Sequence, residues 1–273
     1  PPLGVSRRHY TRKEPPKTPS SSDKGSENVS ESNSNSYKYR FTQEEGLIKI
    51  ENIIESLGLE PGNTFIGFDC DATLKGRPNQ ETGVSRLRHP NILTLLQNLK
   101  GKGFNMHVVT ATSPSRTNWE AISLDLKKLN ILEYFCDEEV DKPTIEKMGV
   151  KSGEDVVGNS IVHGNGIIMP GYEKGAGILH CMPEETRNII FVDDFILNCF
   201  FLDNTMKMVP PVDKLDNIIT IWYDVGPDGY EGTDDYDTYH VLNKTGDDYS
   251  YKDDSATGGL MNTARDQYNN RYP

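Results

Sequence analysis

The sequence predicts an α/β fold, a three-layer α/β/α sandwich around a central and mainly parallel β-sheet. Apolar runs of strand length alternate with segments of helical periodicity, which is typical of parallel sheets built with right-handed crossovers. Runs such as Ile189–Val192 are apolar without interruption, as expected for strands covered by helices on both faces. Both observations fall in the middle of the chain, so the sandwich is expected there.

Composition divides the chain of 273 residues into three segments. Residues 1–40 are rich in Ser, Asn, Pro and Lys and poor in apolar side chains, which predicts a disordered segment. Residues 224–273 form an acidic tail rich in Tyr and Gly, also predicted to be mostly disordered. The folded domain is therefore expected over residues 41–223, and partner binding through the tails stays open.

The first half of the domain is predicted from apolar spacing and from the residues that end helices. A helical face runs from Leu47 to Leu57 and ends at Gly58, and a second helix opens at Pro90 and ends near Gly101. Strands are expected at Thr64–Phe68 and Asn105–Val109, followed by a helix near Thr117–Leu129.

The second half contains one expected hairpin. Residues 135–158 show no regular pattern, but Ser160–Met169 is predicted to form a β-hairpin around Gly164-Asn165-Gly166. The remaining elements are expected as a helix at Lys174–Met182, a strand at Asn188–Val192, a helix at Ile196–Thr205 and a strand at Asn217–Tyr223. These intervals leave room for a small cap over the sheet or for none, and residues 133–170 stay open as a small lid.

Charge, hydropathy and cysteine usage exclude several classes. The net charge is −12 and the predicted domain is itself acidic, which disfavours a protein that binds duplex nucleic acid through a basic face. No apolar run approaches the roughly 18 residues of a membrane span, and no apolar signal segment is visible at the start. We therefore expect a cytoplasmic protein, with delivery into a host cell left open. The four cysteines show no metal-site spacing and are interpreted as reduced thiols.

Polar residues follow three predicted strands, where open α/β sheets bind their ligands. They are Asp69, Asp71 and Thr73 after the first strand, Thr110 and Thr112 after the second, and Asp193 and Asp194 after a later one. If the extended conformation persists, Asp69 and Asp71 point to the same side. Lys174 begins a predicted helix, where the helix terminus adds positive potential. It is therefore preferred over Lys147 and Lys151 as the lysine that lies near these polar residues.

These motifs resemble the haloacid dehalogenase (HAD) superfamily of Mg²⁺-dependent phosphohydrolases. The resemblance spans roughly Phe65–Asn198, and the string from Asn165 through Lys174 to Asp194 further resembles a DUF2608-like bacterial subgroup. Ala72 departs from the family, which often has Gly, Asn or Glu at that position.

The resemblance implies a role for each residue. Asp69 is the implied nucleophile that forms an aspartyl-phosphate, Asp71 the acid and base, and Lys174 the catalytic cation. Thr110 is preferred over Thr112 for contacting the phosphate, and Thr73 is expected to orient the loop. Mg²⁺ is implied to be held by Asp69, the backbone carbonyl of Asp71, Asp193 and Asp194, with Asn198 in support. His107 and His163 are interpreted as ordinary strand residues.

The short intervals between these motifs imply an open site, which suits a phosphate on a macromolecule. The expected activity is hydrolysis of a phosphomonoester on a phosphorylated substrate, such as a phosphoprotein. Two alternatives stay open: a phosphatase for small metabolites or nucleotides, and a HAD-like interaction protein without catalysis. A dehalogenase or phosphotransferase is disfavoured, because Asp71 supplies the acid and base that a phosphatase needs.

Overall fold

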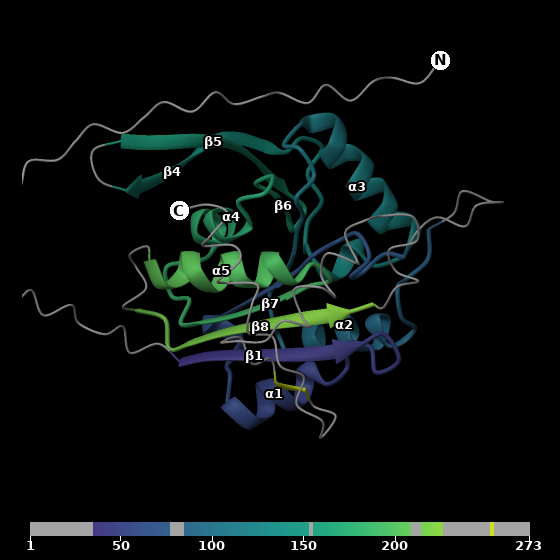
Figure 1. The fold of residues 1–273 in the computed structure, drawn as a ribbon. Coiled ribbons are helices and arrows are strands. Elements are labelled where there is room, and N and C mark those ends of the chain that lie inside the picture. Colours follow the sequence, from purple (N-terminus) through teal and green to yellow (C-terminus); the bar gives the residue numbers. More distant parts are fainter. Residues whose placement is uncertain (1–34, 77–84, 153–154, 209–213, 226–251, 254–273) are drawn as a thin grey trace, which may run out of the picture. The chain divides into compact units, whose positions relative to one another are not determined.

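A computed structural model describes residues 35–76, 85–152, 155–208, 214–225 and 252–253, which form an α/β fold (Figure 1). Its strands are β1 (Asn35–Thr42), β2 (Thr64–Phe68), β3 (Met106–Val109), β4 (Thr144–Ser152), β5 (Asp155–Gly164), β6 (Ile167–Met169), β7 (Asn188–Asp193), β8 (Asn217–Asp224) and β9 (Lys252–Asp253). Its helices are α1 (Ile50–Leu57), α2 (Asn91–Gly101), α3 (Arg116–Lys128), α4 (Lys174–Cys181) and α5 (Ile196–Met208), with 3₁₀ turns at Pro61–Asn63 and Leu132–Tyr134.

The described strands form one mixed sheet in the order β4-β5-β6-β3-β2-β7-β8-β1-β9. Neighbouring strands pair in parallel along the part of the sheet that runs β6-β3-β2-β7-β8-β1-β9. The pairs β4–β5 and β5–β6 are antiparallel. The predicted hairpin is confirmed, because β5 returns as β6 through a turn in which Asn165 and Gly166 both have positive φ, 51° and 68°. Such a turn favours Asn and Gly, as the sequence provides.

Helices cover both faces of the sheet, and the strand side chains alternate between two hydrophobic clusters. One cluster joins β2, β7 and β8 to α1, α2 and α3, through residues such as Ile66, Phe68, Ile190, Val192, Ile219 and Ile221. The other joins the same strands to α4 and α5, through residues such as Phe65, Ile189, Phe191, Ile218 and Trp222. This period-two alternation explains why these strands are apolar throughout.

The strand order reverses beside β2. The chain passes from β2 to β3 and β6 on one side, then crosses back to β7 and β8 on the other side. In open α/β sheets, ligands bind in the crevice outside the carboxyl ends of the strands at such a switch point. The residues that follow β2 and β7 therefore lie where a ligand site is expected.

Several sequence-based boundaries were wrong. Residues 144–152, predicted to be irregular, form β4, whose polar and apolar residues gain their strand conformation by pairing with β5. Residues 35–40, predicted to be disordered, belong to β1; residues 1–34 lie outside the described residues. Asp224 closes β8 and Val225 is buried, so the domain extends two residues into the predicted tail.

The rest of that tail lies outside the described residues, except for β9, which pairs with β1 at the edge of the sheet. Among the helices of the described segments, none combines the length and the apolar character that a membrane span requires.

Candidate active site at the carboxyl ends of β2 and β7

Asp69 directly follows the buried strand β2. Its backbone N–H donates to the carbonyl of Val192 at 2.8 Å, so the strand register brings Asp69 beside Asp193. The Asp69 residue is 6% exposed. Burial raises the pKa of Asp69 well above its ordinary value, and the nearby carboxylates of Asp193 and Asp194 raise it further while Lys174 opposes them.

Asp193 and Asp194 end strand β7, and both are held by hydrogen bonds. The amide of Asn198 donates to both carboxylate oxygens of Asp193, at 3.1 and 3.0 Å, and the Phe195 N–H donates to Oδ1 at 2.8 Å. Asn198 therefore supports Asp193 directly. Asp193 is fully buried, so these donors stand in for the water it has lost.

Thr73 connects the loop after β2 to Asp194. Its hydroxyl donates to Asp194 Oδ1 at 3.1 Å and accepts from the Asp194 N–H at 3.0 Å. Both residues are buried. The reciprocal pair fixes the loop against β7, which is the orienting position expected for Thr73.

Lys174 is the first residue of α4 and its side chain is 3% exposed. Its Nζ contacts Asp69 Oδ1 and lies 2.6 Å from Asp193 Oδ2, so one ammonium bridges the ends of β2 and β7. Burial alone lowers the pKa of Lys174, but the charges of Asp193 and Asp69 outweigh it and raise the pKa above its usual range. Lys147, an alternative, lies exposed on β4.

A glycine lets α4 bring Lys174 into this position. A Cβ at Gly175 would lie 2.8 Å from Cβ of Thr205 on α5, closer than side chains tolerate. The two helices therefore approach one another more closely than any other residue at this position would permit. At the start of α4, Lys174 thus supplies the charge and Gly175 permits the close packing that brings it into place.

Thr110 follows β3, the neighbour of β2, and is buried. Its N–H donates to the carbonyl of Ile168 at 3.0 Å, which fixes its backbone to β6. The hydroxyls of Thr110 and Thr112 lie 3.0 Å apart, and the Thr112 N–H donates to Thr110 Oγ1 at 3.3 Å. The two threonines form one hydroxyl pair at the carboxyl end of the sheet.

Asp69 and Asp71 were expected to point to the same side if the extended conformation persisted, and the chain does not stay extended through Asp71. Strand β2 ends at Phe68, and the chain then turns through Ala72, which has a positive φ of 62°. The side chain of Asp71 is 66% exposed and lies 2.9 Å from the Lys75 ammonium. The strand periodicity behind the expectation therefore does not reach Asp71, and its carboxylate is not part of the buried group.

The buried group combines three carboxylates with one ammonium. Ligand atoms of Asp69, Asp193 and Asp194 lie within 4.8 Å of one another. Lys174 contacts two of the three carboxylates, those of Asp69 and Asp193. Carboxylate oxygens clustered in this way fit the preference of Mg²⁺ for oxygen ligands.

Sequence reasoning missed a second group, Glu146, His163 and His180, whose ligand atoms also lie within 4.8 Å of one another. Its members come from β4, β5 and α4, so no short motif could reveal it. His107, in contrast, behaves as the ordinary strand residue that we expected. Its ring stacks on Phe65 at 4.5 Å, and burial lowers its pKa to about 4.

Comparison of the chain with protein-family models, with curated proteins and with solved structures found no match.

Proposed function

We propose that the protein is a Mg²⁺-dependent phosphatase that hydrolyses phosphomonoesters through an aspartyl-phosphate. The observation that carries this proposal is the meeting of Asp69, Lys174 and Asp193 at the switch point of the sheet. Phosphoryl transfer needs an in-line nucleophile and positive charge around the phosphoryl oxygens. The resemblance to the HAD superfamily, with a small cap or none expected, supports the same conclusion and stays a prediction.

Asp69 is the proposed nucleophile. Its carboxylate oxygen would form a bond to phosphorus as the bond to the ester oxygen breaks, and water would then cleave the acyl phosphate and regenerate Asp69. Lys174 opposes the effect of burial on the pKa of Asp69 and holds its carboxylate in place, because its ammonium bridges Asp69 and Asp193. Thr110, at the end of the neighbouring strand β3, would donate to a phosphoryl oxygen.

Asp71 is the proposed acid and base, although it lies outside the buried group. It would give a proton to the departing ester oxygen and later take one from the attacking water. Its exposure suits a group that meets a substrate arriving from solvent, and the ion pair with Lys75 would have to open for this role.

Mg²⁺ would be held by the carboxylates of Asp69, Asp193 and Asp194, and when bound it supplies charge neutralisation for the phosphoryl group. Asn198 and Thr73 would orient Asp193 and Asp194 through the hydrogen bonds that they already make.

An exposed phosphate on a macromolecule, such as a phosphoprotein, is the proposed substrate class. Between β2 and β7, the described helices and strands belong to the sheet and to the layers that cover it. In particular, Met148 of β4 and Ile161 of β5 pack with Ala176 and Ile178 of α4 in one hydrophobic cluster. That packing favours a site without a large cap domain.

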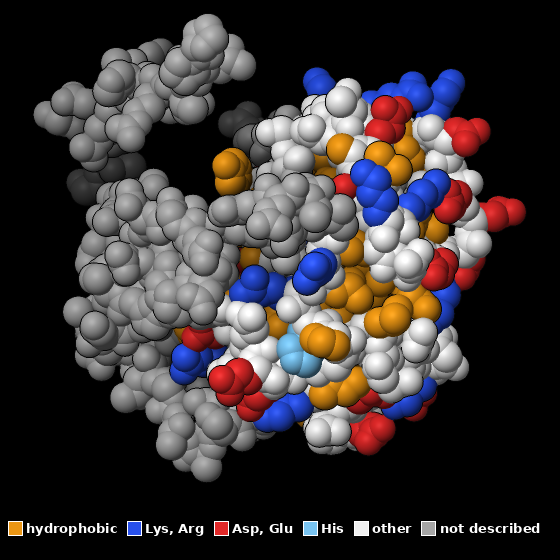
Figure 2. All heavy atoms as spheres, turned by 90° about the vertical axis from the view of Figure 1, so that its right-hand side faces the viewer, with side chains coloured by type: hydrophobic (Ala, Val, Ile, Leu, Met, Phe, Trp, Pro, Cys, Tyr) orange, Lys and Arg blue, Asp and Glu red, His pale blue; other side chains and the backbone are white. Residues whose placement is uncertain are grey.

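The described residues on the face shown in Figure 2 give no support to a nucleic-acid binder. The side of the molecule toward which β1 and β8 point in Figure 1 faces the viewer in Figure 2, where acidic, basic and hydrophobic side chains are interspersed. A duplex-binding protein instead gathers Lys and Arg on one face.

Hydrolysis of an aryl phosphate by the full-length protein, with Mg²⁺ and with EDTA, tests the proposal. Asp69→Asn should lower the Mg²⁺-dependent rate on the order of 10³-fold or more, because it removes the nucleophile. Asp216→Asn, which removes an exposed carboxylate paired with Arg187 before β8, is the matched control and should keep the rate. Equal rates for Asp69→Asn and wild type would eliminate the mechanism, and a wild-type rate no higher than that without protein would favour a non-catalytic interaction protein.

A phosphatase panel tests the substrate class separately. Phosphopeptides carrying phosphotyrosine should be hydrolysed faster than sugar phosphates and nucleotides. The reverse order would favour the small-metabolite alternative while leaving the aspartyl-phosphate mechanism intact.

A further inference from the structure

The β4–β5 hairpin presents two polar side chains toward α4. Glu146 pairs with Ile161 across the hairpin, and His163 lies two residues after Ile161, so Glu146 and His163 share one face. Ile161 is buried on this face, whereas Ile145, on the opposite face, is 59% exposed. The hairpin therefore turns Glu146 and His163 toward the helix.

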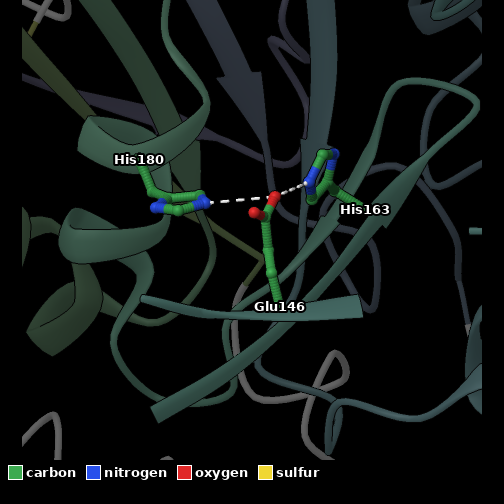
Figure 3. Close-up of side chains that lie close together, drawn as sticks. All are labelled: Glu146, His163 and His180. Atoms are coloured by element: carbon green, nitrogen blue, oxygen red, sulfur yellow. Dashed lines mark hydrogen bonds and ion pairs between the residues drawn. The ribbon is translucent and has the colours of Figure 1, made fainter. Parts of the chain in front are cut away.

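His180, in the last turn of α4, completes a group of three. Figure 3 shows its ring and that of His163 on either side of the Glu146 carboxylate. Oε1 of Glu146 lies 2.6 Å from His163 Nε2 and 3.3 Å from His180 Nε2. The hydrogen bonds to both histidines lower the pKa of Glu146, so its carboxylate is ionised near neutral pH.

We propose that Glu146, His163 and His180 form a binding site for a divalent transition metal such as Zn²⁺. Two imidazole nitrogens and one carboxylate are the donors of many three-ligand zinc sites, and nitrogen donors select transition metals over Mg²⁺. In tetrahedral coordination with bonds of about 2.0–2.1 Å, ligand atoms lie roughly 3.3 Å apart. The Glu146–His180 distance already has this value, and the Glu146–His163 pair needs to open by less than about 1 Å.

All three side chains are partly exposed, which leaves a coordination position for water or another small ligand. The site is distinct from the buried acidic group. Lys174 belongs to that group and His180 to this one, and the six steps along the chain from one to the other correspond to about 9 Å along the axis of α4. A bound ion would join β4, β5 and α4 at this point.

The competing interpretation is a hydrogen-bonded triad in which Glu146 accepts from two imidazole N–H groups and binds no metal. Zn²⁺ titration of the full-length protein, followed by calorimetry in excess Mg²⁺ after removal of any histidine tag, distinguishes the two. We expect one Zn²⁺ per chain. The melting temperature should rise by roughly 5–10 °C when the free Zn²⁺ concentration is about a hundred times Kd.

Substitution of the ligands tests the assignment. His163→Ala and His180→Ala should each weaken Zn²⁺ binding by at least about 100-fold, since losing an outer partner alone costs 10–100-fold. Both positions are near the surface, so the variants should fold, which circular dichroism checks. His240→Ala, outside the described residues, and Cys181→Ser, beside His180, are the controls and should bind as wild type does.

Three outcomes would overturn the proposal. In the first, wild type binds no more Zn²⁺ than His163→Ala does, which leaves a hydrogen-bonded triad only. In the second, Cys181→Ser loses binding while both histidine variants keep it, which assigns the ion to a thiol. In the third, Asp193→Asn abolishes binding, which assigns the ion to the acidic group. None of these results bears on hydrolysis of phosphate esters, so the two proposals fail independently.

Discussion

The two ends of α4 carry groups of titratable side chains that contrast in burial and in charge. Lys174 at the first turn lies among three buried carboxylates, whereas His180 at the last turn lies with His163 and Glu146 near the surface. Removing one partner from the buried group leaves charges that water cannot reach, and removing one from the exposed group does not. The same kind of substitution should therefore have very different consequences at the two ends.

The largest effect is expected at Lys174. Lys174→Met leaves the buried carboxylates of Asp69 and Asp193 without this ammonium, and should lower the free energy of unfolding by about 3–5 kcal/mol. Chemical denaturation measures this change, and Lys147→Met on the exposed side of β4 should stay within about 0.5 kcal/mol. Added Mg²⁺ should restore more stability to Lys174→Met than to wild type, and an identical response would contradict a cation site formed by these carboxylates.

His107 sharpens the contrast, because it is a buried titratable group without a countercharge. Its pKa falls to about 4 in the folded state against an ordinary 6.5, so only the unfolded chain gains a proton between these values. Stability should fall as the pH drops through this window, by about 1.4 kcal/mol per pH unit and about 3 kcal/mol in total. His107→Phe keeps the stacked ring and should remove this part of the acid sensitivity, as thermal denaturation from pH 7 to pH 4 would reveal.

Thr73 tests the hydrogen bonds around the buried group without changing its charge. Thr73→Val keeps the shape but removes the donor to Asp194 Oδ1 and the acceptor of the Asp194 N–H. Leaving these buried groups unpaired should cost about 1–3 kcal/mol of unfolding free energy. Thr144→Val, at an exposed position of β4, provides the control, and equal effects at both positions would show that the reciprocal pair does not stabilise the loop.

Asp69→Asn should act on stability in the direction opposite to its effect on activity. The raised pKa of Asp69 means that ionising it costs more in the folded than in the unfolded protein, so the metal-free protein loses stability as the pH rises above the ordinary value of 3.8. The amide removes that cost, and the variant should gain about 0.5–2 kcal/mol at pH 7 and nothing below pH 3.8. A loss of stability at pH 7 in EDTA would show that the ion pair with Lys174 outweighs desolvation.

The smallest effect is expected at the exposed end of α4. Without metal, Glu146→Gln should change the free energy of unfolding by no more than about 0.5 kcal/mol, because the side chain is 44% exposed. A loss of unfolding free energy as large as that expected for Lys174→Met would contradict the difference between the two ends of α4. Urea denaturation in EDTA provides the measurement.

The local sequence pattern predicted elements correctly where a strand is buried on both faces or where a helix begins at a characteristic residue. Strand β2 was predicted at its true bounds, because five apolar or small residues precede Asp69 and a turn follows. Helix α4 was predicted from Lys174, although only the structure reveals that Gly175 is required by the contact with Thr205. The meeting of Asp69, Lys174 and Asp193 was an implication of the resemblance to the HAD superfamily, whose motifs lie at these element ends.

Pattern failed where pairing partners or turns decided the conformation. Strand β4 exists because β5 pairs with it, and its residues from Thr144 to Met148 are mostly exposed and polar, so they carry no periodic signal. Period-two geometry says nothing of Asp71, because the strand ends at Phe68 and the chain then turns, with a positive φ at Ala72. Glu146, His163 and His180 come together only through the tertiary contact of a hairpin with a helix.

The close contact at Gly175 has a consequence for recognising other chains that share this arrangement. An alanine there would force α4 away from Thr205, and the ammonium of Lys174 would withdraw from its carboxylates even though every charged residue remained. A chain can therefore retain all the charged residues and still lose the geometry through one methyl group. The dipeptide Lys-Gly at the start of such a helix is accordingly a more specific signature than the lysine alone.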